Sequence, residues 1–449
     1  MGRLFGTDGA RGIANIEITS ELAMKIGRAA AMVLSDYSEK KLKFLIGTDT
    51  RKSADMLSFA LASGLCSVGA DVLMLGVVPT PAVAFLVKSY GYDAGVMISA
   101  SHNPCEYNGI KIFQHNGYKL PDATEDEIEA IILDDAKIPP VVTGGDIGKI
   151  TFAENAVTDY VNHIASTTDR LFSGMRIVLD CANGSASMTA MKLFTQLGAE
   201  CTVINAQPDG TNINEKCGST HIEYLAEYVK SHGADAGFAF DGDADRLLAV
   251  DKNGNVVDGD MLMAITAKYL KEKNRLSGNT VVATVMSNMG LFEFCNKHGI
   301  NCEKTKVGDR YVLERMLENG YHIGGEQSGH LIFLDYATTG DGQLSAVQIM
   351  NIIADTGKSL DELAAEIEIF PQVLKNVKVS AFGKHRLNED YDIKLAVETA
   401  EKELSTNGRV LVRASGTEPL IRVMIEGRNK EQIEKLATMI AKTVEERLI

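Results

Sequence analysis

Ser101 has the residue type and position of a nucleophile. It follows the short apolar run Gly95–Ile98, which is typical of a strand buried on both faces of a parallel sheet. Ligands of open α/β sheets collect beyond the carboxyl ends of the strands, so we expect the Ser101 hydroxyl at the mouth of a site. Pro104 restricts the residue before it to extended conformations, which prevents a helix from continuing the strand directly. The alternative is structural, because serine commonly caps a helix or closes a turn.

Three aspartates, Asp241, Asp243 and Asp245, follow a second apolar run at a spacing of two residues. Carboxylates this close would repel one another without a cation, and the small residues between them let the chain curl around one hard ion. An EF-hand also begins D-x-D-x-D, but it requires Gly at position six and Glu at position twelve, where this chain has Arg246 and Lys252. Three carboxylates suit Mg²⁺, which takes part of its shell from phosphate and water. The pattern therefore predicts a magnesium site, with a solvated acidic turn as the alternative.

The segment 324–330, GGEQSGH, places a carboxylate, an amide, a hydroxyl and an imidazole on one glycine-rich loop. These groups suit paired hydrogen bonds to neighbouring hydroxyls of a sugar, because a missing partner would leave a polar group unmatched. His330 also has a structural interpretation, as a hydrogen-bonded histidine of the core. The loop alone is a weak indication of sugar binding.

The segment 413–419, RASGTEP, together with Arg422 predicts an anion site. It offers two guanidinium groups, two hydroxyls and a glycine that lets backbone N–H groups converge on a phosphate. An ordinary hairpin turn is the alternative. A further glycine-rich loop, 5–12, carries Arg11, but its glycines do not fit GxGxxG, and Gly357-Lys358-Ser359 lacks the upstream glycine of a P-loop. Nucleotide hydrolysis and dinucleotide redox chemistry therefore lose their usual sequence support.

The elements that must position these residues alternate between strand and helix, which indicates βαβ units and mainly parallel sheets. The alternation occurs three times. The first repeat has strands at 42–47, 71–75 and 94–98 and a helix at 53–67. The second has strands at 176–180, 200–204 and 236–240 and helices at 187–197 and 222–231. The third has strands at 280–285 and 301–304 and helices at 290–298 and 309–318. Three related α/β domains are the economical interpretation.

The last part of the chain differs, with strands at 372–379, 410–413 and 420–426 and a closing helix at 430–447. This pattern predicts a smaller α+β domain with an antiparallel sheet. The predicted fold class is thus α/β, with three related domains of mixed, mainly parallel sheet and a C-terminal α+β domain. The predicted domains are 1–150 with the serine segment, 151–252 with the aspartates, 253–369 with GGEQSGH and 370–449 with RASGTEP.

The composition restricts the class of protein. A net charge of -15 argues against a nucleic-acid partner, which would require a basic face. The longest apolar stretches are far shorter than the ~18 residues that span a bilayer, and the first residues do not form a signal peptide. We therefore expect a cytoplasmic protein without a membrane partner. Seven scattered cysteines without a CxxC pair predict free thiols.

Taken together, the motifs strongly resemble those of the α-D-phosphohexomutase superfamily. The match runs essentially from end to end and includes, in family order, FGTDGARG, ISASHNP followed by NGIK, DGDADR, TKVGDRYV, GGEQSGH and RASGTEPLIRV. One such motif would be suggestive, whereas the ordered set is highly specific. The resemblance implies four domains around a central cleft, the first three of related α/β topology and the fourth a smaller, mobile α+β domain.

The resemblance also implies a reaction and its cofactors. Ser101 would be a phosphoserine, and Mg²⁺ would be held by its phosphate and by Asp241, Asp243 and Asp245. The implied reaction interconverts glucosamine 6-phosphate and glucosamine 1-phosphate and supplies UDP-N-acetylglucosamine for peptidoglycan precursors. Its intermediate or activator would be glucosamine 1,6-bisphosphate or glucose 1,6-bisphosphate. The expected partners are small sugar phosphates, and a homodimer is left open beside a monomer.

The resemblance assigns roles to further residues. Arg11, Lys111 and His330 would lie near the transferring group, with Lys111 or His330 as general acid or base, and Arg246 would add positive charge. Glu326 and Ser328 would hold sugar hydroxyls. The phosphate that does not react would be bound by Arg413, Ser415, Gly416, Thr417 and Arg422. The alternative is a phosphomannomutase or phosphoglucomutase of the same superfamily, but the Gln of GGEQSGH and the FGTDG and SGTEP forms favour the amino sugar.

Overall fold

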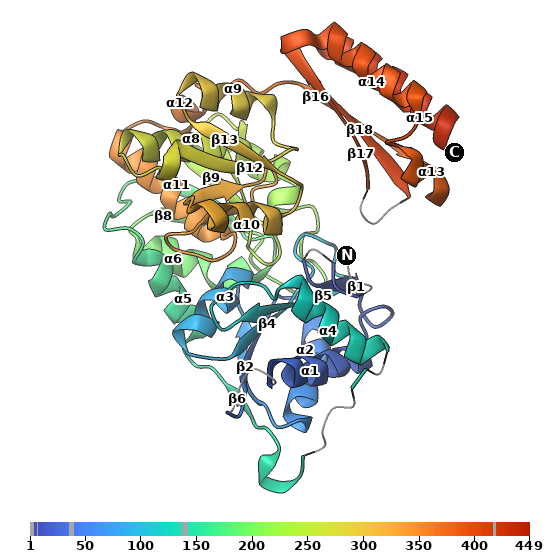
Figure 1. Cartoon of the computed structure of the whole chain (residues 1–449). Coiled ribbons are helices and arrows are strands. Elements are labelled where there is room, and N and C mark those ends of the chain that lie inside the picture. Colours follow the sequence, from blue (N-terminus) through green and yellow to red (C-terminus); the bar gives the residue numbers. More distant parts are fainter. Residues whose placement is uncertain (1–3, 7, 36–39, 135, 138–141, 416–418) are drawn as a thin grey trace. The chain divides into compact units, whose positions relative to one another are not determined.

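The computed structural model describes residues 4–6, 8–35, 40–134, 136–137, 142–415 and 419–449. These residues form two compact units, one comprising the chain up to residue 286 with 299–365, and the other comprising 287–298 with 366–449. Three of the four sheets belong to the first unit and one to the second (Figure 1). The four sheets confirm the predicted fold class.

The first sheet has the order β1-β5-β4-β2-β3-β6, with β2, β3, β4 and β6 parallel and β1 and β5 antiparallel to their neighbours. Its strands are β1 (Ala10–Ile13), β2 (Lys43–Thr48), β3 (Asp71–Val77), β4 (Ala94–Ile98), β5 (Tyr107–Gln114) and β6 (Ile150–Phe152), and its helices are α1 (Ser20–Ser35), α2 (Ser53–Ser67), α3 (Thr80–Ser89) and α4 (Asp122–Leu133). Phe44 and Ile46 of β2 pack into one buried cluster with α1, α2 and α4. Helix α3 covers the other face, since Val83 lies against Gly47 and Gly95 (Figure 1).

The second sheet has the order β11-β10-β9-β7-β8, in which β7 is parallel to β8 and β9 while β10 is antiparallel to β9. Its elements are α5 (Ala156–Ala165), β7 (Arg176–Asp180), α6 (Ala190–Gln196), β8 (Glu200–Ile204), α7 (Glu223–His232), β9 (Ala236–Phe240), β10 (Leu247–Asp251) and β11 (Val256–Val257). The predicted helix at 187–197 begins later, at Ala190, because residues 185–188 form a short 3-10 turn. Every residue of β9 is buried, as the unalternating apolar run predicts.

The third sheet has the order β13-β12-β14-β15, with β12 parallel to β13 and β14, and β15 antiparallel to β14. Its elements are α8 (Gly259–Glu272), β12 (Thr280–Thr284), β13 (Asn301–Thr305), α10 (Asp309–Asn319), β14 (Ile323–Gly325), β15 (Leu331–Phe333), α11 (Gly342–Thr356) and α12 (Leu360–Ala364). Helix α11 begins at an N-cap, where the Asp341 carboxylate accepts a hydrogen bond from the Leu344 N–H.

One connection recurs in all three sheets of the first unit. In each, a parallel strand is followed directly by an antiparallel partner: β4 by β5, β9 by β10, and β14 by β15. We call the three connecting segments the serine loop (99–106), the aspartate loop (241–246) and the histidine loop (326–330). The shared topology explains why these three chemically distinct motifs all stand at the ends of buried strands.

The second unit contains the three-stranded antiparallel sheet β16-β18-β17 and four helices. Its elements are α9 (Met289–Lys297), β16 (Gln372–Lys378), α13 (Ala381–Arg386), α14 (Tyr391–Leu404), β17 (Gly408–Ala414), β18 (Leu420–Gly427) and α15 (Lys430–Leu448). Helix α15 buries a stripe that includes Ile433, Leu436 and Ile440 in the core of this unit. The strand predicted at 410–413 is longer, and helix α14 was not predicted.

Two compositional predictions can be compared with the structure. All seven cysteines are free thiols, as predicted. Among the described residues, no helix has both the length and the apolar character needed to span a bilayer.

Candidate functional site

Ser101 lies in the serine loop with its hydroxyl directed at the aspartate loop. The residue is 1% exposed, and its Oγ donates a hydrogen bond to Asp241 Oδ2 at 2.6 Å. The backbone N–H of Ser101 donates to Ser99 Oγ at 2.9 Å. Its φ of 53° is in the left-handed region, which side chains other than glycine seldom adopt. Ser101 lies in a turn that the Asn103 N–H closes on the Ala100 carbonyl, so the turn alternative is correct for its backbone, while the hydroxyl is held by its hydrogen bond to Asp241.

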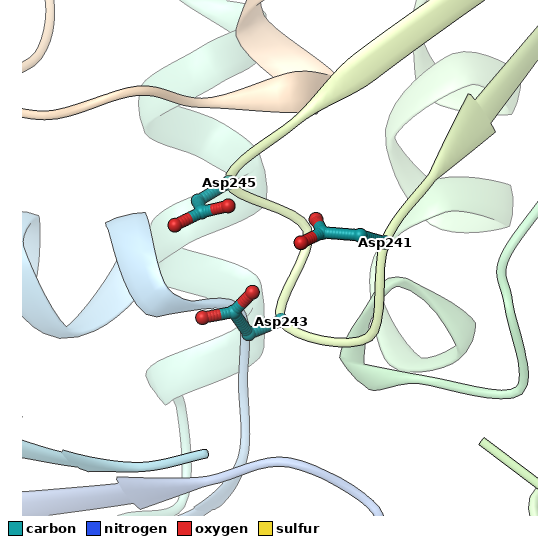
Figure 2. A group of neighbouring side chains, drawn as sticks. All are labelled: Asp241, Asp243 and Asp245. Atoms are coloured by element: carbon teal, nitrogen blue, oxygen red, sulfur yellow. The ribbon is translucent and has the colours of Figure 1, made fainter. Parts of the chain in front are cut away.

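The aspartate loop brings the three predicted carboxylates around one bend (Figure 2). One ligand oxygen from each of Asp241, Asp243 and Asp245 lies within 4.8 Å of the others, and all three residues are buried. Burial raises the pKa of Asp241, and the neighbouring Asp245 and Asp243 raise it further. Burial acts in the same direction on Asp245, but Lys111 and His330 outweigh it and hold the pKa of Asp245 well below its usual range.

The free oxygens of this loop fit a metal ion. Asp243 Oδ2 accepts hydrogen bonds from Thr80 Oγ1 at 2.6 Å and Lys111 Nζ at 2.9 Å. The second oxygens of Asp243 and Asp245 are buried and have no hydrogen-bond donor among the described residues. Arg246 Nε lies 3.9 Å from Asp245 Oδ1, too far for a hydrogen bond. Buried carboxylate oxygens without a hydrogen-bond donor are costly unless a cation meets them, so the three aspartates are able to bind a metal ion.

Six ionisable side chains form a closed chain of contacts that includes Asp245, and His330 adds a positive charge to it only when its imidazole is protonated. We call this chain the charge ring. Its neighbouring contacts are Lys111–Asp8 at 3.1 Å, Asp8–Lys119 at 2.5 Å, Lys119–Asp309 at 2.5 Å, Asp309–His330 at 3.5 Å, His330–Asp245 at 3.7 Å and Asp245–Lys111 at 3.5 Å. Three predicted site residues, Lys111, His330 and Asp245, belong to it. Sequence reasoning missed Asp8, Lys119 and Asp309, although Asp8 and Asp309 lie within the motifs FGTDGARG and TKVGDRYV.

His330 lies in this ring between two carboxylates. Burial disfavours a charged imidazole, but Asp245 and Asp309 outweigh it and raise the pKa of His330. The Gly340 N–H donates a hydrogen bond to His330 Nε2 at 3.1 Å. The neutral imidazole of His330 therefore carries its proton on Nδ1, which faces Asp245. His330 was interpreted either as a hydrogen-bonded histidine of the core or as a residue of the site. Both descriptions apply, because His330 is buried and also lies next to Asp245.

Two guanidinium groups act electrostatically on His102, the residue that follows Ser101. The Arg11 guanidinium, on β1 opposite Gly109, pairs with Asp8, and Arg246 Nε lies 3.9 Å from Asp245 Oδ1. The backbone N–H of Arg246 donates a hydrogen bond to Asp241 Oδ1 at 3.2 Å. The Nε atoms of both arginines are buried without an acceptor among the described residues. The pKa of the neighbouring His102 is lowered to about 4 by burial and by Arg246 and Arg11. This corner of the site can accept an anion.

The histidine loop places its two predicted sugar ligands differently. Glu326 is partly buried and accepts a hydrogen bond from the Gly308 N–H at 3.1 Å, whereas Ser328 is exposed. The loop is tied to the strand after the aspartates by a hydrogen bond from the Leu247 N–H to the Gly329 carbonyl. Gly329 has a φ of 93°, and a Cβ there would meet the Leu247 carbonyl oxygen at 2.2 Å. The close approach of the two loops therefore requires glycine.

The predicted anion site lies in the second unit, at the hairpin between β17 and β18. Arg413 and Arg422 are register partners on these strands, and we call them the arginine pair. Burial lowers the pKa of Arg413, and the charge of Arg422 lowers it further. The Ser415 N–H donates to the Leu420 carbonyl at 2.9 Å. Gly416 and Thr417 lie outside the described residues.

Comparison with known proteins identifies the family. Sequence profiles of the phosphoglucomutase/phosphomannomutase family match as alpha/beta/alpha domain I over residues 2–138, domain II over 158–254, domain III over 258–370 and the C-terminal domain over 374–443. The chain is 56% identical to the phosphoglucosamine mutase of Ruminiclostridium cellulolyticum and 55% identical to that of Acetivibrio thermocellus, in each case over 100% of both chains. The chain therefore belongs to the phosphohexomutases, and within them to the bacterial phosphoglucosamine mutases.

Solved structures share the fold. A phosphoglucomutase/phosphomannomutase family protein from Burkholderia thailandensis superimposes with a TM-score of 0.83 at 24% identity, covering 99% of this chain and 98% of that one. The N-acetylphosphoglucosamine mutase of Aspergillus fumigatus, solved with GlcNAc-6P and magnesium, superimposes with a TM-score of 0.69 at 17% identity over 99% and 96% of the two chains. At these identities the likeness supports the fold alone.

Proposed function

We propose that this protein interconverts glucosamine 6-phosphate and glucosamine 1-phosphate, with Ser101 as the carrier of the phosphoryl group. The hydrogen bond from Ser101 Oγ to Asp241, beside two carboxylate oxygens that have no hydrogen-bond donor among the described residues, is the observation that carries the proposal. Relatives that match the whole chain at 52–56% identity are phosphoglucosamine mutases, which favours the amino sugar over mannose or glucose phosphates.

The metal of the site would be Mg²⁺. Asp241, Asp243 and Asp245 would hold it together with the phosphate on Ser101. Phosphorylation replaces the Ser101 hydroxyl proton, so the hydrogen bond to Asp241 Oδ2 is lost and that oxygen becomes available. When bound, Mg²⁺ would offset the roughly -1.5 to -2 charge of the phosphoserine and polarise the phosphoryl group.

The proposed transfer proceeds in two halves. In the first, the bond between phosphorus and Ser101 Oγ breaks as the sugar O1 bonds to phosphorus, which produces glucosamine 1,6-bisphosphate. The proton of the attacking hydroxyl passes to Lys111 or His330, the two candidate bases. In the second half the bisphosphate has turned over, the bond between phosphorus and O6 breaks, and Ser101 Oγ takes that phosphoryl group. The residue that accepted the proton in the first half returns it to O6, which leaves glucosamine 1-phosphate and the phosphorylated Ser101. Glucose 1,6-bisphosphate would load Ser101 by the same step.

The other predicted residues would stabilise charge and bind the substrate. Arg11 and Arg246 would contact the phosphoryl oxygens, since phosphoryl transfer depends mainly on alignment and charge stabilisation. Glu326 and Ser328 would hold sugar hydroxyls. The phosphate that does not react would be bound by Arg413, Ser415, Gly416, Thr417 and Arg422. Each half-reaction would present a different phosphate to this second group, which is why it must accept either one.

The setting of the reaction follows from its product. Glucosamine 1-phosphate would supply UDP-N-acetylglucosamine for peptidoglycan precursors, and we place the protein in the cytoplasm on that ground. Its partners would be sugar phosphates, as in the fungal relative solved with GlcNAc-6P and magnesium. A homodimer stays a prediction.

The test compares wild type with Ser101→Ala. The purified wild-type protein should contain a fraction heavier by one phosphate and should convert glucosamine 6-phosphate faster than mannose or glucose phosphates when primed with bisphosphate. Ser101→Ala should lose the phosphate and at least ~10³-fold of the turnover. Full activity of Ser101→Ala would overturn the covalent mechanism, and a clear preference for the hydroxy sugars would overturn the choice of substrate.

A further inference from the structure

Arg51 is a buried guanidinium to which the proposed mechanism gives no role. It follows β2, and its side chain is 0% exposed. It donates hydrogen bonds to four backbone carbonyls: those of Ser101 at 2.9 Å, Asn103 at 2.8 Å, Tyr107 at 3.1 Å and Pro104. Three of these acceptors belong to the serine loop, and the fourth is the first residue of β5. Arg51 therefore binds the backbone around Ser101.

The orientation of Arg51 is itself fixed by Asp49, which is equally buried. Arg51 Nε donates to Asp49 Oδ2 at 2.8 Å, and the same oxygen accepts a hydrogen bond from Ser99 Oγ at 2.6 Å. Ser99 Oγ in turn accepts from the Ser101 N–H at 2.9 Å. The contacts form a closed circuit from Arg51 through Asp49 and Ser99 to Ser101, so the amide and the carbonyl of Ser101 are both held.

A second group holds the same carbonyls from another domain. Asn214, which precedes α7 of the second sheet, donates through Nδ2 to the carbonyls of Ser101 at 2.9 Å and Asn103 at 3.0 Å. The left-handed backbone of Ser101 costs on the order of 1–3 kcal/mol and persists only where the surroundings over-determine it. Arg51 and Asn214 supply that constraint by their donors to the Ser101 carbonyl.

We propose that Arg51 is a positioning residue for phosphoryl transfer, which holds the serine-loop backbone so that Ser101 Oγ faces the aspartate loop. The inference rests on the proposed function, since it concerns the group that Ser101 transfers. The Arg51 guanidinium binds the backbone behind Ser101 and the Asp49 carboxylate, so its effect is on geometry. A misplacement of about 1 Å at a transferring group can cost ~10²-fold in rate.

Arg51→Lys tests the proposal, because an ammonium retains the charge but cannot span four carbonyls and Asp49. Single-turnover transfer from phosphorylated Ser101 to glucosamine 6-phosphate should slow by ~10²-fold, while KM should change by less than about threefold. Arg28→Lys is the matched control, since Arg28 on α1 contacts Ser67 and lies outside the circuit. Its transfer rate should equal that of wild type.

Two milder variants keep the test decisive if Arg51→Lys fails to fold. Ser99→Ala removes two contacts of the circuit, the hydrogen bond to Asp49 and the one from the Ser101 N–H. Asn214→Gly removes the second donor to the Ser101 carbonyl, and glycine tolerates the φ of 58° at that position. Each should slow the transfer ~10-fold in a protein whose circular dichroism and thermal midpoint remain close to those of wild type. A loss of rate that merely equals the loss of folded protein would overturn the positioning role.

The outcomes separate this inference from the proposed function. In one outcome, wild type carries phosphate on Ser101 and transfers it, and the folded variants Arg51→Lys, Ser99→Ala and Asn214→Gly all transfer it at rates within about twofold of the wild-type rate. That outcome overturns the positioning role alone. If wild type never carries phosphate on Ser101, the proposed function fails, and the inference fails with it.

Discussion

The charge ring of the first unit and the arginine pair of the second unit differ in how their charges are arranged. In the charge ring, each cation contacts carboxylates. Lys111, for example, contacts Asp8 and Asp245 of the ring and also Asp243. In the second unit, two cations stand opposite each other on neighbouring strands, and Arg413 Nε is buried without an acceptor among the described residues. Like charges directly opposite in a sheet are destabilising.

The difference indicates what each region does. A ring that carries its own counter-charges holds its shape without a ligand, which suits groups that must be aligned for transfer. A pair of like charges is relieved by an anion, which suits a site that binds and releases a phosphate. Four substitutions, in decreasing order of their effect, test this contrast.

Asp243→Asn disrupts the first region most severely. It keeps the size of the side chain but removes the charge that contacts Lys111 and that the proposed metal would share, so turnover should fall on the order of 10³-fold. Mg²⁺ binding, measured by calorimetry, should weaken in parallel. Asp55→Asn, an exposed aspartate on α2, is the control and should behave as wild type. Mg²⁺ affinity unchanged in Asp243→Asn would remove this carboxylate from the metal site.

Arg413→Gln disrupts the second region. Loss of one guanidinium should raise KM for glucosamine 6-phosphate by ~10–100-fold and reduce kcat much less, because the proposed contact is to a phosphate that does not react. The free protein should gain ~0.2–1 kcal/mol of stability as the repulsion from Arg422 is relieved. Steady-state kinetics and urea denaturation measure the two effects, with exposed Lys402→Gln as control. A large fall in kcat at constant KM would contradict a binding role.

Thr80→Val disturbs the aspartate loop without changing its charge. Thr80, at the start of α3, donates its hydroxyl to the Asp243 carboxylate and its N–H to the Asp243 carbonyl at 2.9 Å. Valine removes the hydroxyl bond, so kcat should fall ~10-fold. Thr80→Ser retains the donor and should restore most of the rate. Equal rates for the valine and serine variants would show that the hydroxyl does not orient Asp243.

Glu125→Gln tests the electrostatics of the first unit through pH. Burial raises the pKa of Glu125 on α4 to about 7; Lys119 opposes this shift, and Glu129 reinforces it. A carboxyl whose folded pKa is raised holds its proton more tightly in the folded state, so the free energy of unfolding falls as pH rises from about 4.5 to about 7.

The glutamine variant should therefore lose less stability across this range. It also loses the ion pair between Arg310 Nη2 and Glu125 Oε2 at 3.3 Å, so the slope of stability with pH is the quantity to compare. Urea denaturation at pH 5 and pH 8 measures the difference. Glu127→Gln, at an exposed position of the same helix, should follow wild type. Parallel pH curves for wild type and Glu125→Gln would exclude Glu125 as the source of the slope.

The local parts of the site could be predicted well from the sequence, for a physical reason. Short apolar runs such as 94–98 and 236–240 mark buried parallel strands, and polar residues directly after them stand at strand ends. Ser101 and the three aspartates could therefore be located from local patterns alone. Arg51 could not, because its burial depends on carbonyls about fifty positions further along the chain. Lys119 was missed for the same reason, since it meets Asp309 across 190 positions.

The amino-acid sequence thus specifies the chemical groups, the strands that carry them and the family to which they belong. Only the packing of the sheets determines which groups meet: Ser101 with Asp241 across 140 positions, and Lys111 with Asp243 across 132. Local periodicity specifies secondary structure, because it depends on neighbouring residues. The distances and charges between loops depend on how three sheets pack together, and no local pattern records them.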